Sequence, residues 1–333
     1  MRYPVGVFDE NRLVRLLQER FGRSAAHLKK GIGDDAAVIR PKGAAESWAI
    51  TTDMLLEDVD FRRGWLTPEQ LGHKSLAVNL SDLAAMGARP RFYTVALAIP
   101  KGTSEGWIRR YYEGLTRSGN ASGAVLIGGD LSRSRSGIQI CIAALGESVG
   151  GKLVYRSGGK AGDALYVTGV LGKSAAGLEL LKRGFTRART GDQRQALDAH
   201  ASPQARCDVG LWLARRFARA MMDLSDGLSV DLPRLCAASG VGAEILTEQI
   251  PLFPASAAWG CDPLDLALHG GEDFELLFTV AKRNVVAFER SYPRKFPPVT
   301  RIGNLTGRTG VITLRSGAAS KKLPERGFDH FRN

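Results

Sequence analysis

The chain has 333 residues, of which 44% are hydrophobic and 24% are charged. These ordinary globular proportions exclude a disordered, collagen-like or low-complexity protein, and the length suffices for about two domains. Lys and Arg (46) exceed Asp and Glu (34), and the resulting net charge of +12 favours anionic partners without choosing among them.

The four cysteines form no CxxC pair and the five histidines form no HxxxH pair, so we expect neither a zinc site nor a disulfide-bonded fold. Reduced thiols favour a cytoplasmic protein. The N-terminal residues lack the apolar core of a signal peptide, and no run of about 18 apolar residues predicts a membrane span.

The first half of the chain mixes predicted helices and strands. The clearest helix covers 66–87, where Thr67 and Gln70 fit a capping box, Pro68 fits the first helical position and Gly87 fits the stop. Further helices are predicted over 9–21 and 104–123, and strands over 47–53, 92–100, 124–130 and 137–149, with a glycine turn and short strand in 31–40. We expect a first domain over 1–150.

A second domain is expected over 151–333. The predicted elements are a strand over 162–169, helices over 174–184 and 204–219, a strand, turn and helix over 221–240, a turn and strand over 270–280, and alternating strands and turns over 297–314. Residues 185–200 are polar and are predicted to be exposed.

Aspartates recur at predicted strand and helix ends. A single Asp-Gly turn is ordinarily only a turn, but acidic residues at five separate ends of a basic protein indicate one shared edge, where mixed sheets commonly bind ligands. These acidic residues and their hydroxyl neighbours are Asp34, Asp35, Thr51, Thr52, Asp53, Asp130, Asp223, Ser225, Asp226, Glu272 and Asp273.

Asp82 lies within the helix predicted over 66–87. Lys74, Val78 and Asp82 share one side of that helix by four-residue spacing, and Asn79 adjoins Asp82. Two interpretations stay open: a polar stripe on the helix surface, or a carboxylate that points into a site from a rigid support.

Aspartates with Thr and Ser hydroxyls, without His or Cys, make an oxygen site that suits Mg²⁺ or Mn²⁺. Several carboxylates need several cations between them, and a polyphosphate ligand is the natural reason to collect such ions. The chain has no GxxxxGK[ST] loop and no kinase HRD or DFG motif. Phosphates would be held by metal ions, glycine-turn amides and Arg156 or Lys160, although an arginine alone is ordinarily a surface charge.

The ordered motifs GIGDDAAVI, TTDMLLEDVDF, HKSLAVNLSDLAAMGARP, LIGGD, YRSGGKAGD, DLSDGLSVDL, GGEDFELLFT and GFDHF resemble those of the thiamine-monophosphate kinase family over nearly the whole chain. The resemblance implies the α/β (α+β) fold of aminoimidazole ribonucleotide synthetase. That fold has a mixed-sheet α/β N-terminal domain, which dimerises through its sheet, and an α+β C-terminal domain. It also implies transfer of a phosphoryl group from ATP to thiamine monophosphate, the last step in making thiamine diphosphate, with several Mg²⁺ ions in a homodimer.

The resemblance also implies site residues. Metal ligands would be Asp35, Thr51, Thr52, Asp53, Asp82, Asp130, Asp223 and Asp226. ATP would contact Tyr112, Gly129, Asp130, Arg156 and Ser225, and the substrate would contact Asp60, Glu272 and Phe328. At Asp60 the family often has a histidine; the carboxylate here would suit the thiazolium cation but repel the phosphate.

The implied mechanism needs no general base, because the second phosphate pKa of about 6 leaves the attacking oxygen largely anionic at pH 7. The barrier is the approach of two polyanions, since two unit charges at 4 Å repel by about 4 kcal/mol at a dielectric of 20. The aspartates would then carry metal ions that offset this repulsion.

Relatives with the same fold are alternatives. Selenophosphate synthetase needs a reactive cysteine near the N-terminus, but the first cysteine is Cys141; the hydrogenase-maturation dehydratase ends in a cysteine, but this chain ends His-Phe-Arg-Asn. Aminoimidazole ribonucleotide synthetase stays possible, although GFDHF and NLSDLAAMGA favour the thiamine enzyme.

A nucleic-acid-binding protein is the alternative from another class, but the basic residues of this chain are dispersed and no nucleic-acid-binding motif is present. The densest basic run, Lys182 to Arg189, is predicted to be a solvated loop.

Overall fold

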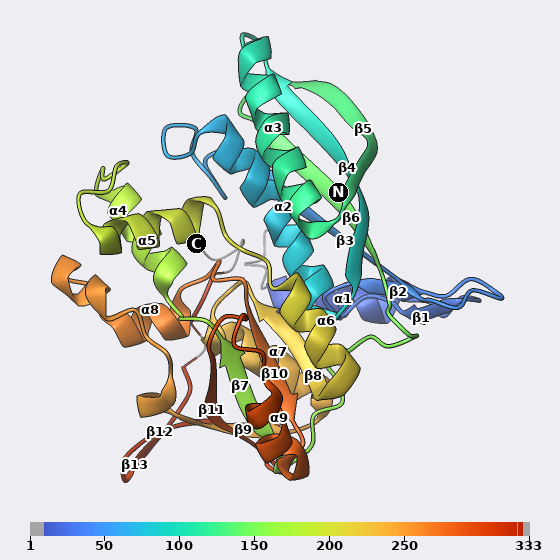
Figure 1. The fold of residues 1–333 in the computed structure, drawn as a ribbon, viewed down its shortest axis with the longest axis vertical. Helices are drawn as coiled ribbons and strands as arrows, with labels where there is room; N and C mark the ends of the chain where they lie inside the picture. Colours follow the sequence, from blue (N-terminus) through green and yellow to red (C-terminus); the bar gives the residue numbers. More distant parts are fainter. Residues whose placement is uncertain (1–9, 325, 329–333) are drawn as a thin grey trace, which may run out of the picture.

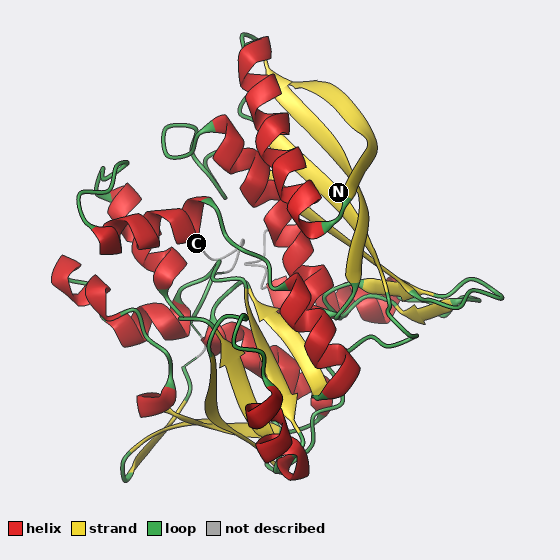
Figure 2. Cartoon of the chain, in the orientation of Figure 1, coloured by secondary structure: helices red, strands yellow, loops and turns green. Residues whose placement is uncertain are grey.

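The computed structural model describes residues 10–324 and 326–328, which form two mixed β-sheets with helices packed against them (Figure 1, Figure 2). The N-terminal elements are α1 (Glu10–Phe21), β1 (Leu28–Lys30), β2 (Ala37–Ile39), β3 (Trp48–Leu56), α2 (Pro68–Ala85), β4 (Arg89–Pro100), α3 (Glu105–Ser122), β5 (Val125–Ser134) and β6 (Gln139–Glu147).

The C-terminal elements follow after residue 150. They are β7 (Ala164–Thr168), α4 (Lys173–Lys182), α5 (Gly191–Ala201), α6 (Cys207–Arg216), β8 (Ala218–Leu224), α7 (Leu228–Ser239), β9 (Gly242–Leu246), η1 (Thr247–Gln249), η2 (Pro254–Trp259), α8 (Pro263–His269), β10 (Glu275–Val280), η3 (Lys282–Asn284), α9 (Val285–Ser291), β11 (Val299–Thr306), β12 (Ile312–Ser316) and β13 (Ala319–Lys322).

The N-terminal sheet has the strand order β1-β2-β3-β6-β4-β5, and only β4 and β5 pair in parallel. Helices α2 and α3 cover one face, where their leucines meet the inward residues of β4 and β6 in one core. The two helices lie so close that a Cβ at Gly114 would stand 1.9 Å from the Glu69 carbonyl oxygen, which requires glycine there. The sheet's other face is open in the described chain, and Met54 on it is 59% exposed.

The C-terminal sheet has the order β13-β12-β9-β11-β7-β10-β8, and only β12 and β9 pair in parallel. Helices cover both faces of its centre, so β7 and β10 are buried throughout. Residues from α7 and α8 join the core on one face, and residues from α6 and α9 join the core on the other. Mixed sheets with helices in both halves confirm the predicted two-part α/β and α+β architecture.

Helix α2 links the two halves and lies at the centre of the molecule in Figure 1. Its Leu76, Leu80 and Leu83 belong to the N-terminal core, whereas Ala84 and Ala85 pack in the C-terminal core. The predicted capping box is confirmed: the Gln70 amide donates to Thr67 Oγ1 at 3.2 Å, and the Thr67 amide donates to Gln70 Oε1 at 2.9 Å. A side chain on α2 therefore has a rigid support between the two sheets.

The expectation that residues 185–200 are exposed is wrong over their second half. Helix α5 begins after Thr190, whose side chain accepts from the Gln193 amide, and Leu197 and His200 are buried. Its apolar face is made largely of alanines, which pack so closely on α4 that a Cβ at Gly177 would lie 2.1 Å from the Ala196 carbonyl oxygen. Small residues give weak hydrophobic periodicity, which explains the error. The basic run from Lys182 to Arg189 is exposed, as predicted.

Two predicted strand ends are also wrong. Strand β3 continues to Leu56, so Asp53 lies inside it, and β5 continues to Ser134, so Gly129 and Asp130 lie within a strand rather than in a turn. Both strands carry polar or glycine residues at positions that ordinarily end strands, and pairing with β4 and β6 outweighs that local preference. Helix α6 ends at Arg216, earlier than predicted, because β8 begins at Ala218.

Among the described residues, no helix is long and apolar enough to cross a membrane.

Candidate active site

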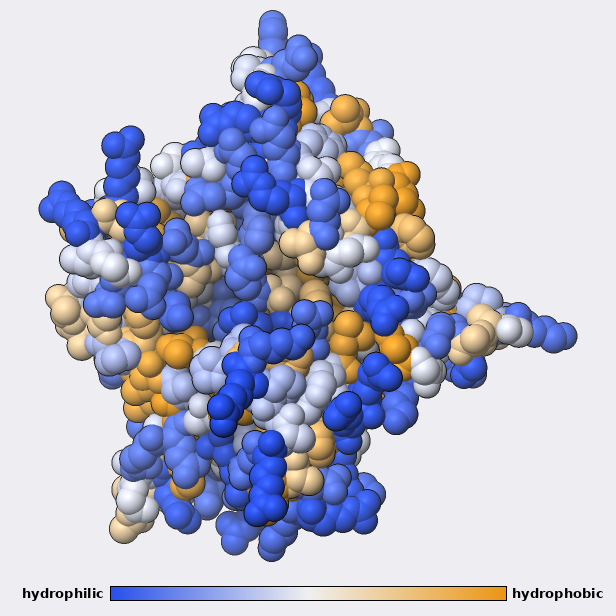
Figure 3. Space-filling view, viewed as in Figure 1, coloured by the Kyte–Doolittle hydropathy of each residue, from blue (hydrophilic) through white to orange (hydrophobic). Residues whose placement is uncertain are grey.

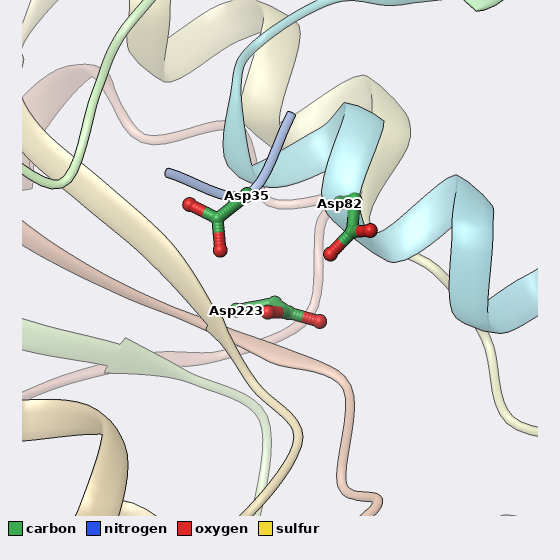
Figure 4. A group of neighbouring side chains, drawn as sticks. All are labelled: Asp35, Asp82 and Asp223. Atoms are coloured by element: carbon green, nitrogen blue, oxygen red, sulfur yellow. The ribbon is translucent and has the colours of Figure 1, made fainter. Parts of the chain in front are cut away.

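Three aspartates from separate parts of the chain meet in one place. Asp35 comes from the loop between β1 and β2, Asp82 from α2, and Asp223 from β8, and their side chains lie beside one another (Figure 4). One oxygen from each lies within 4.8 Å of the others. Both halves of the chain therefore contribute to one acidic group, as the distribution of aspartates predicted.

The acidic group has few donors for its charge. Thr51 Oγ1 donates to Asp82, Ser81 Oγ donates to Asp223 at 2.6 Å, and Arg156 Nη2 donates to Asp35 at 2.7 Å. Loss of hydration and the neighbouring carboxylates together raise the pKa of Asp82 and of Asp223 well above the ordinary value. Loss of hydration also raises the pKa of Asp35, although Arg156 lowers it. Cations bound between these oxygens would remove the repulsion.

Asp53 extends the acidic group along β3. Loss of hydration, followed by the charges of Asp226 and Asp60, raises the pKa of Asp53 to about 6. Its Oδ2 is buried and has no hydrogen-bond partner, and the same is true of Asp35 Oδ2. Asp60 accepts a hydrogen bond from the Leu56 amide at 2.7 Å, so its carboxylate also stabilises the turn after β3.

The loop between β8 and α7 brings Ser225 and Asp226 beside this group. Asp231 Oδ2 accepts from three successive amides, those of Ser225 (3.1 Å), Asp226 (3.0 Å) and Gly227 (3.1 Å). Arg234 Nη1 pairs with Asp226 and, at 3.0 Å, with Asp231. Asp231 and Arg234 were not predicted as site residues. The available signal was a carboxylate four residues after the Asp-Gly turn, at the start of a helix.

Thr52 and Asp130 lie on the other face of the N-terminal sheet, whereas the strand register places Gly129 in the inward row of Val95. Strand pairing places Asp130 in one row with Ala96, Cys141 and Met54, on the face opposite α2. Asp130 and Thr52 are both exposed. Because β4 and β6 separate β5 from β3, their strands are about 14 Å apart, at roughly 4.8 Å per neighbouring pair. Within one chain, Asp130 and Thr52 cannot bind the same ion.

The remaining predicted residues lie at other edges of the site. Glu272 pairs with Lys74 of α2 at 2.7 Å. Phe328 is 36% exposed, and its amide donates to the Asp226 carbonyl oxygen at 3.4 Å, so the end of the described chain crosses the loop that follows β8. Tyr112 packs against the N-terminal core from α3 and meets Tyr111 edge-on; no described contact joins it to the acidic group.

The site suits a hard divalent cation. Its donors are carboxylate and hydroxyl oxygens, and two buried carboxylate oxygens have no partner. Mg²⁺ prefers oxygen ligands of this kind and commonly binds through one or two carboxylates together with substrate phosphates. Asp35, Asp53, Asp82 and Asp223 are the residues that fit this role in the described chain.

The fold agrees with comparisons against known proteins. The family described as AIR synthase related protein, N-terminal domain, matches residues 33–148, and its C-terminal domain counterpart matches residues 160–314. The chain has the two-domain fold of this family.

Among curated relatives, the thiamine-monophosphate kinase of Escherichia coli is 37% identical over 318 residues, covering 94% of this chain and 95% of its own. The Bacillus subtilis thiamine-monophosphate kinase is 34% identical over 310 residues, covering 91% and 93%. Among solved structures, AaThiL complexed with AMPPCP and TMP is 31% identical, with a TM-score of 0.85 and 99% coverage of both chains. The chain belongs to the thiamine-monophosphate kinases of the AIR synthase-related family.

Proposed function

We propose that this chain transfers the γ-phosphoryl group of ATP to the phosphate of thiamine monophosphate, releasing ADP and thiamine diphosphate. The observation that carries the proposal is the acidic group of Asp35, Asp82 and Asp223, which joins both halves of the chain. Membership of the thiamine-monophosphate kinases supplies the substrate class. The AaThiL structure holds AMPPCP and TMP together, as a direct transfer between two bound molecules requires.

The geometry of α2 supports one orientation of the substrate. Lys74, Val78 and Asp82 lie on one side of this helix, and eight residues separate the ends of this row by about 12 Å. Glu272 lies at the Lys74 end, and the acidic group lies at the Asp82 end. The phosphate therefore lies beside Asp82, and the aminopyrimidine lies toward Glu272, with Val78 beneath the connecting rings.

The protein needs to align two phosphorylated molecules rather than to remove a proton. A phosphate oxygen of thiamine monophosphate is the nucleophile, and it is already largely anionic at pH 7 because its second pKa is about 6. Bound Mg²⁺ would offset the repulsion between the phosphates and polarise the transferred group. Asp35, Asp53, Asp82 and Asp223 would hold these ions, whereas Arg156 is placed to meet nucleotide phosphates beside Asp35. None of these residues is assigned as a general base.

We further propose a dimer in which a second copy covers the open face of the N-terminal sheet. Supporting this, Val125 on the edge strand β5 and Met54 on β3 are 56% and 59% exposed, and an apolar patch lies over β5 at the upper right of Figure 3. Asp130 lies on this strand, far from the acidic group of its own chain. In the dimer, Asp130 of one copy would hold a metal ion together with Thr52 of the other, on the open face of its sheet. The four cysteines are free, which fits the cytoplasmic location that we propose for this step.

The test of this function is incubation of the protein with ATP, Mg²⁺ and a panel of phosphorylated acceptors, followed by chromatographic and mass analysis of products. We expect thiamine diphosphate and ADP in equal amounts from thiamine monophosphate, and no product when Mg²⁺ is chelated. ADP and inorganic phosphate without a phosphorylated acceptor, or a preference for another acceptor, would contradict the proposal.

A further inference from the structure

A buried cation on α2 joins the two halves of the chain at Glu272. The Lys74 side chain is fully buried, and its Nζ lies 2.7 Å from Glu272 Oε1. His200 lies on helix α5, and its Nδ1 is 3.2 Å from Glu272 Oε2. The same nitrogen lies 3.2 Å from Ser174 Oγ on α4. Each oxygen of one carboxylate therefore has its own partner, and these partners come from two different helices.

Charge in this cluster is arranged to keep Glu272 ionised. Burial alone would raise the pKa of Glu272, but the charge of Lys74 is the main cause that lowers it below the ordinary value. Burial and then the charge of Lys74 lower the pKa of His200 to about 4, so the imidazole is neutral at pH 7. A neutral imidazole beside the carboxylate fills the space next to Oε2 while adding no second cation.

The position of Glu272 is unusual for a residue that only supports the fold. Its side chain is 29% exposed although Lys74 is fully buried, so part of this side chain stays accessible. Its backbone has φ of +65°, a left-handed conformation that is uncommon outside glycine, and its amide donates to the Ser225 carbonyl oxygen at 2.7 Å. Strained, accessible groups that are fixed from several sides are typical of binding sites.

We propose that Lys74 and His200 are positioning residues that fix the Glu272 carboxylate, so that its accessible side accepts N–H groups from the aminopyrimidine of thiamine monophosphate. This inference rests on the proposed function. Lys74 occupies Oε1 and His200 holds Oε2, so the carboxylate cannot rotate away from the substrate. Because Lys74 and Asp82 stand on the same helix, α2 also fixes the distance between the ring-binding end and the phosphate-binding end of the site.

The test is Lys74→Met, measured with thiamine monophosphate and with ATP as the varied substrate. We expect the KM for thiamine monophosphate to rise about tenfold, as for the loss of a charge-assisted hydrogen bond, and the KM for ATP and kcat to change less than about twofold. Glu272→Gln should have a similar effect, and the double variant should be no worse than Glu272→Gln alone, because Lys74 acts through Glu272.

Arg206→Met is the matched control. Arg206 pairs with the buried Glu275 at 2.7 Å in the same half of the chain, so its loss should lower the Tm without separating the two KM values. Equal changes in both KM values for Lys74→Met, or additive effects in the double variant, would overturn the inference while leaving the kinase activity of the wild type intact. If the wild type makes no thiamine diphosphate, the proposed function itself has failed.

A second pair of variants keeps the inference testable if Lys74→Met does not fold. His200→Leu removes the imidazole nitrogen that lies 3.2 Å from Glu272 Oε2, and we expect a KM for thiamine monophosphate about fivefold higher. His200→Gln supplies an N–H donor and should return the KM toward the wild-type value. An equal KM for both variants would contradict a positioning role for His200.

Discussion

Asp53 should destabilise the metal-free protein, and its replacement by asparagine should therefore stabilise the fold while abolishing activity. The carboxylate ionises near pH 3.8 in its ordinary state, but its folded-state pKa is about 6, because of burial and the charges of Asp226 and Asp60. A carboxyl group whose pKa is higher in the folded state contributes its full stability below its unfolded-state pKa. It loses this contribution as the pH rises through its folded-state pKa. The relevant window is thus pH 4 to 6.

The size of the effect follows from these two values. At pH 8, ionisation of Asp53 in the folded state costs about 3 kcal/mol relative to the unfolded chain, and at pH 4.5 it costs about 1 kcal/mol. Asparagine has the same shape and no charge. In the presence of EDTA, Asp53→Asn should therefore raise the free energy of unfolding by about 3 kcal/mol at pH 8 and by about 1 kcal/mol at pH 4.5.

The assay is urea unfolding followed by circular dichroism at both pH values, with EDTA and again with Mg²⁺. Mg²⁺ should stabilise the wild type at pH 8 more than it stabilises Asp53→Asn. The matched control is Asp163→Asn, a buried aspartate that pairs with Arg219 at 3.1 Å and should lose stability when neutralised. If Asp53→Asn is no more stable than the wild type at pH 8 in EDTA, the electrostatic reasoning is refuted.

Three further predictions concern activity. Asp82→Asn and Asp223→Asn should each reduce kcat by at least about a thousandfold with native circular dichroism, because each removes a ligand from the same group; near-normal turnover at saturating Mg²⁺ would contradict this. Asp130→Ala should be inactive alone. After subunit exchange with the inactive Asp82→Asn variant, the mixture should recover about a quarter of wild-type activity, because half of the dimers are mixed and each mixed dimer has one intact site. A mixture that stays inactive would place Asp130 in its own chain's site. Deletion of residues 327–333 should raise the KM for thiamine monophosphate more than the KM for ATP. The deletion removes the aromatic ring of Phe328, whose contact with the substrate would be worth about 0.5–2 kcal/mol. An unchanged KM for thiamine monophosphate would count against that contact.

Features governed by local chemistry were predictable from the sequence. Thr67, Pro68 and Gln70 specify the start of α2 through capping, and the helix confirms them. The meeting of Asp35 and Asp223 was predictable from acidic residues at separate element ends, whereas helix spacing left two interpretations for Asp82, and the structure places it in the group. The family motifs added the substrate and the nucleotide.

Features governed by pairing between distant segments were not predictable in the same way. The α5 helix has too few large apolar residues to show a periodic pattern, and its burial depends on the close approach of α4 at Gly177. The contact of Lys74 with Glu272 joins residues from different halves of the chain, so helix spacing could indicate that Lys74 shares a side with Asp82 but not which partner it meets. The position of Asp130 on the open sheet face depended on strand order, which the sequence pattern did not give.

The most direct test of the account is the number of divalent ions bound when nucleotide is present, measured by electron paramagnetic resonance of Mn²⁺ with AMPPCP. Asp82 comes from the N-terminal half and Asp223 from the C-terminal half, so Asp82→Asn and Asp223→Asn should each lose the same tightly bound ion that the wild type retains. Wild-type Mn²⁺ binding in either variant would show that the two halves do not share a metal site, and would contradict the account.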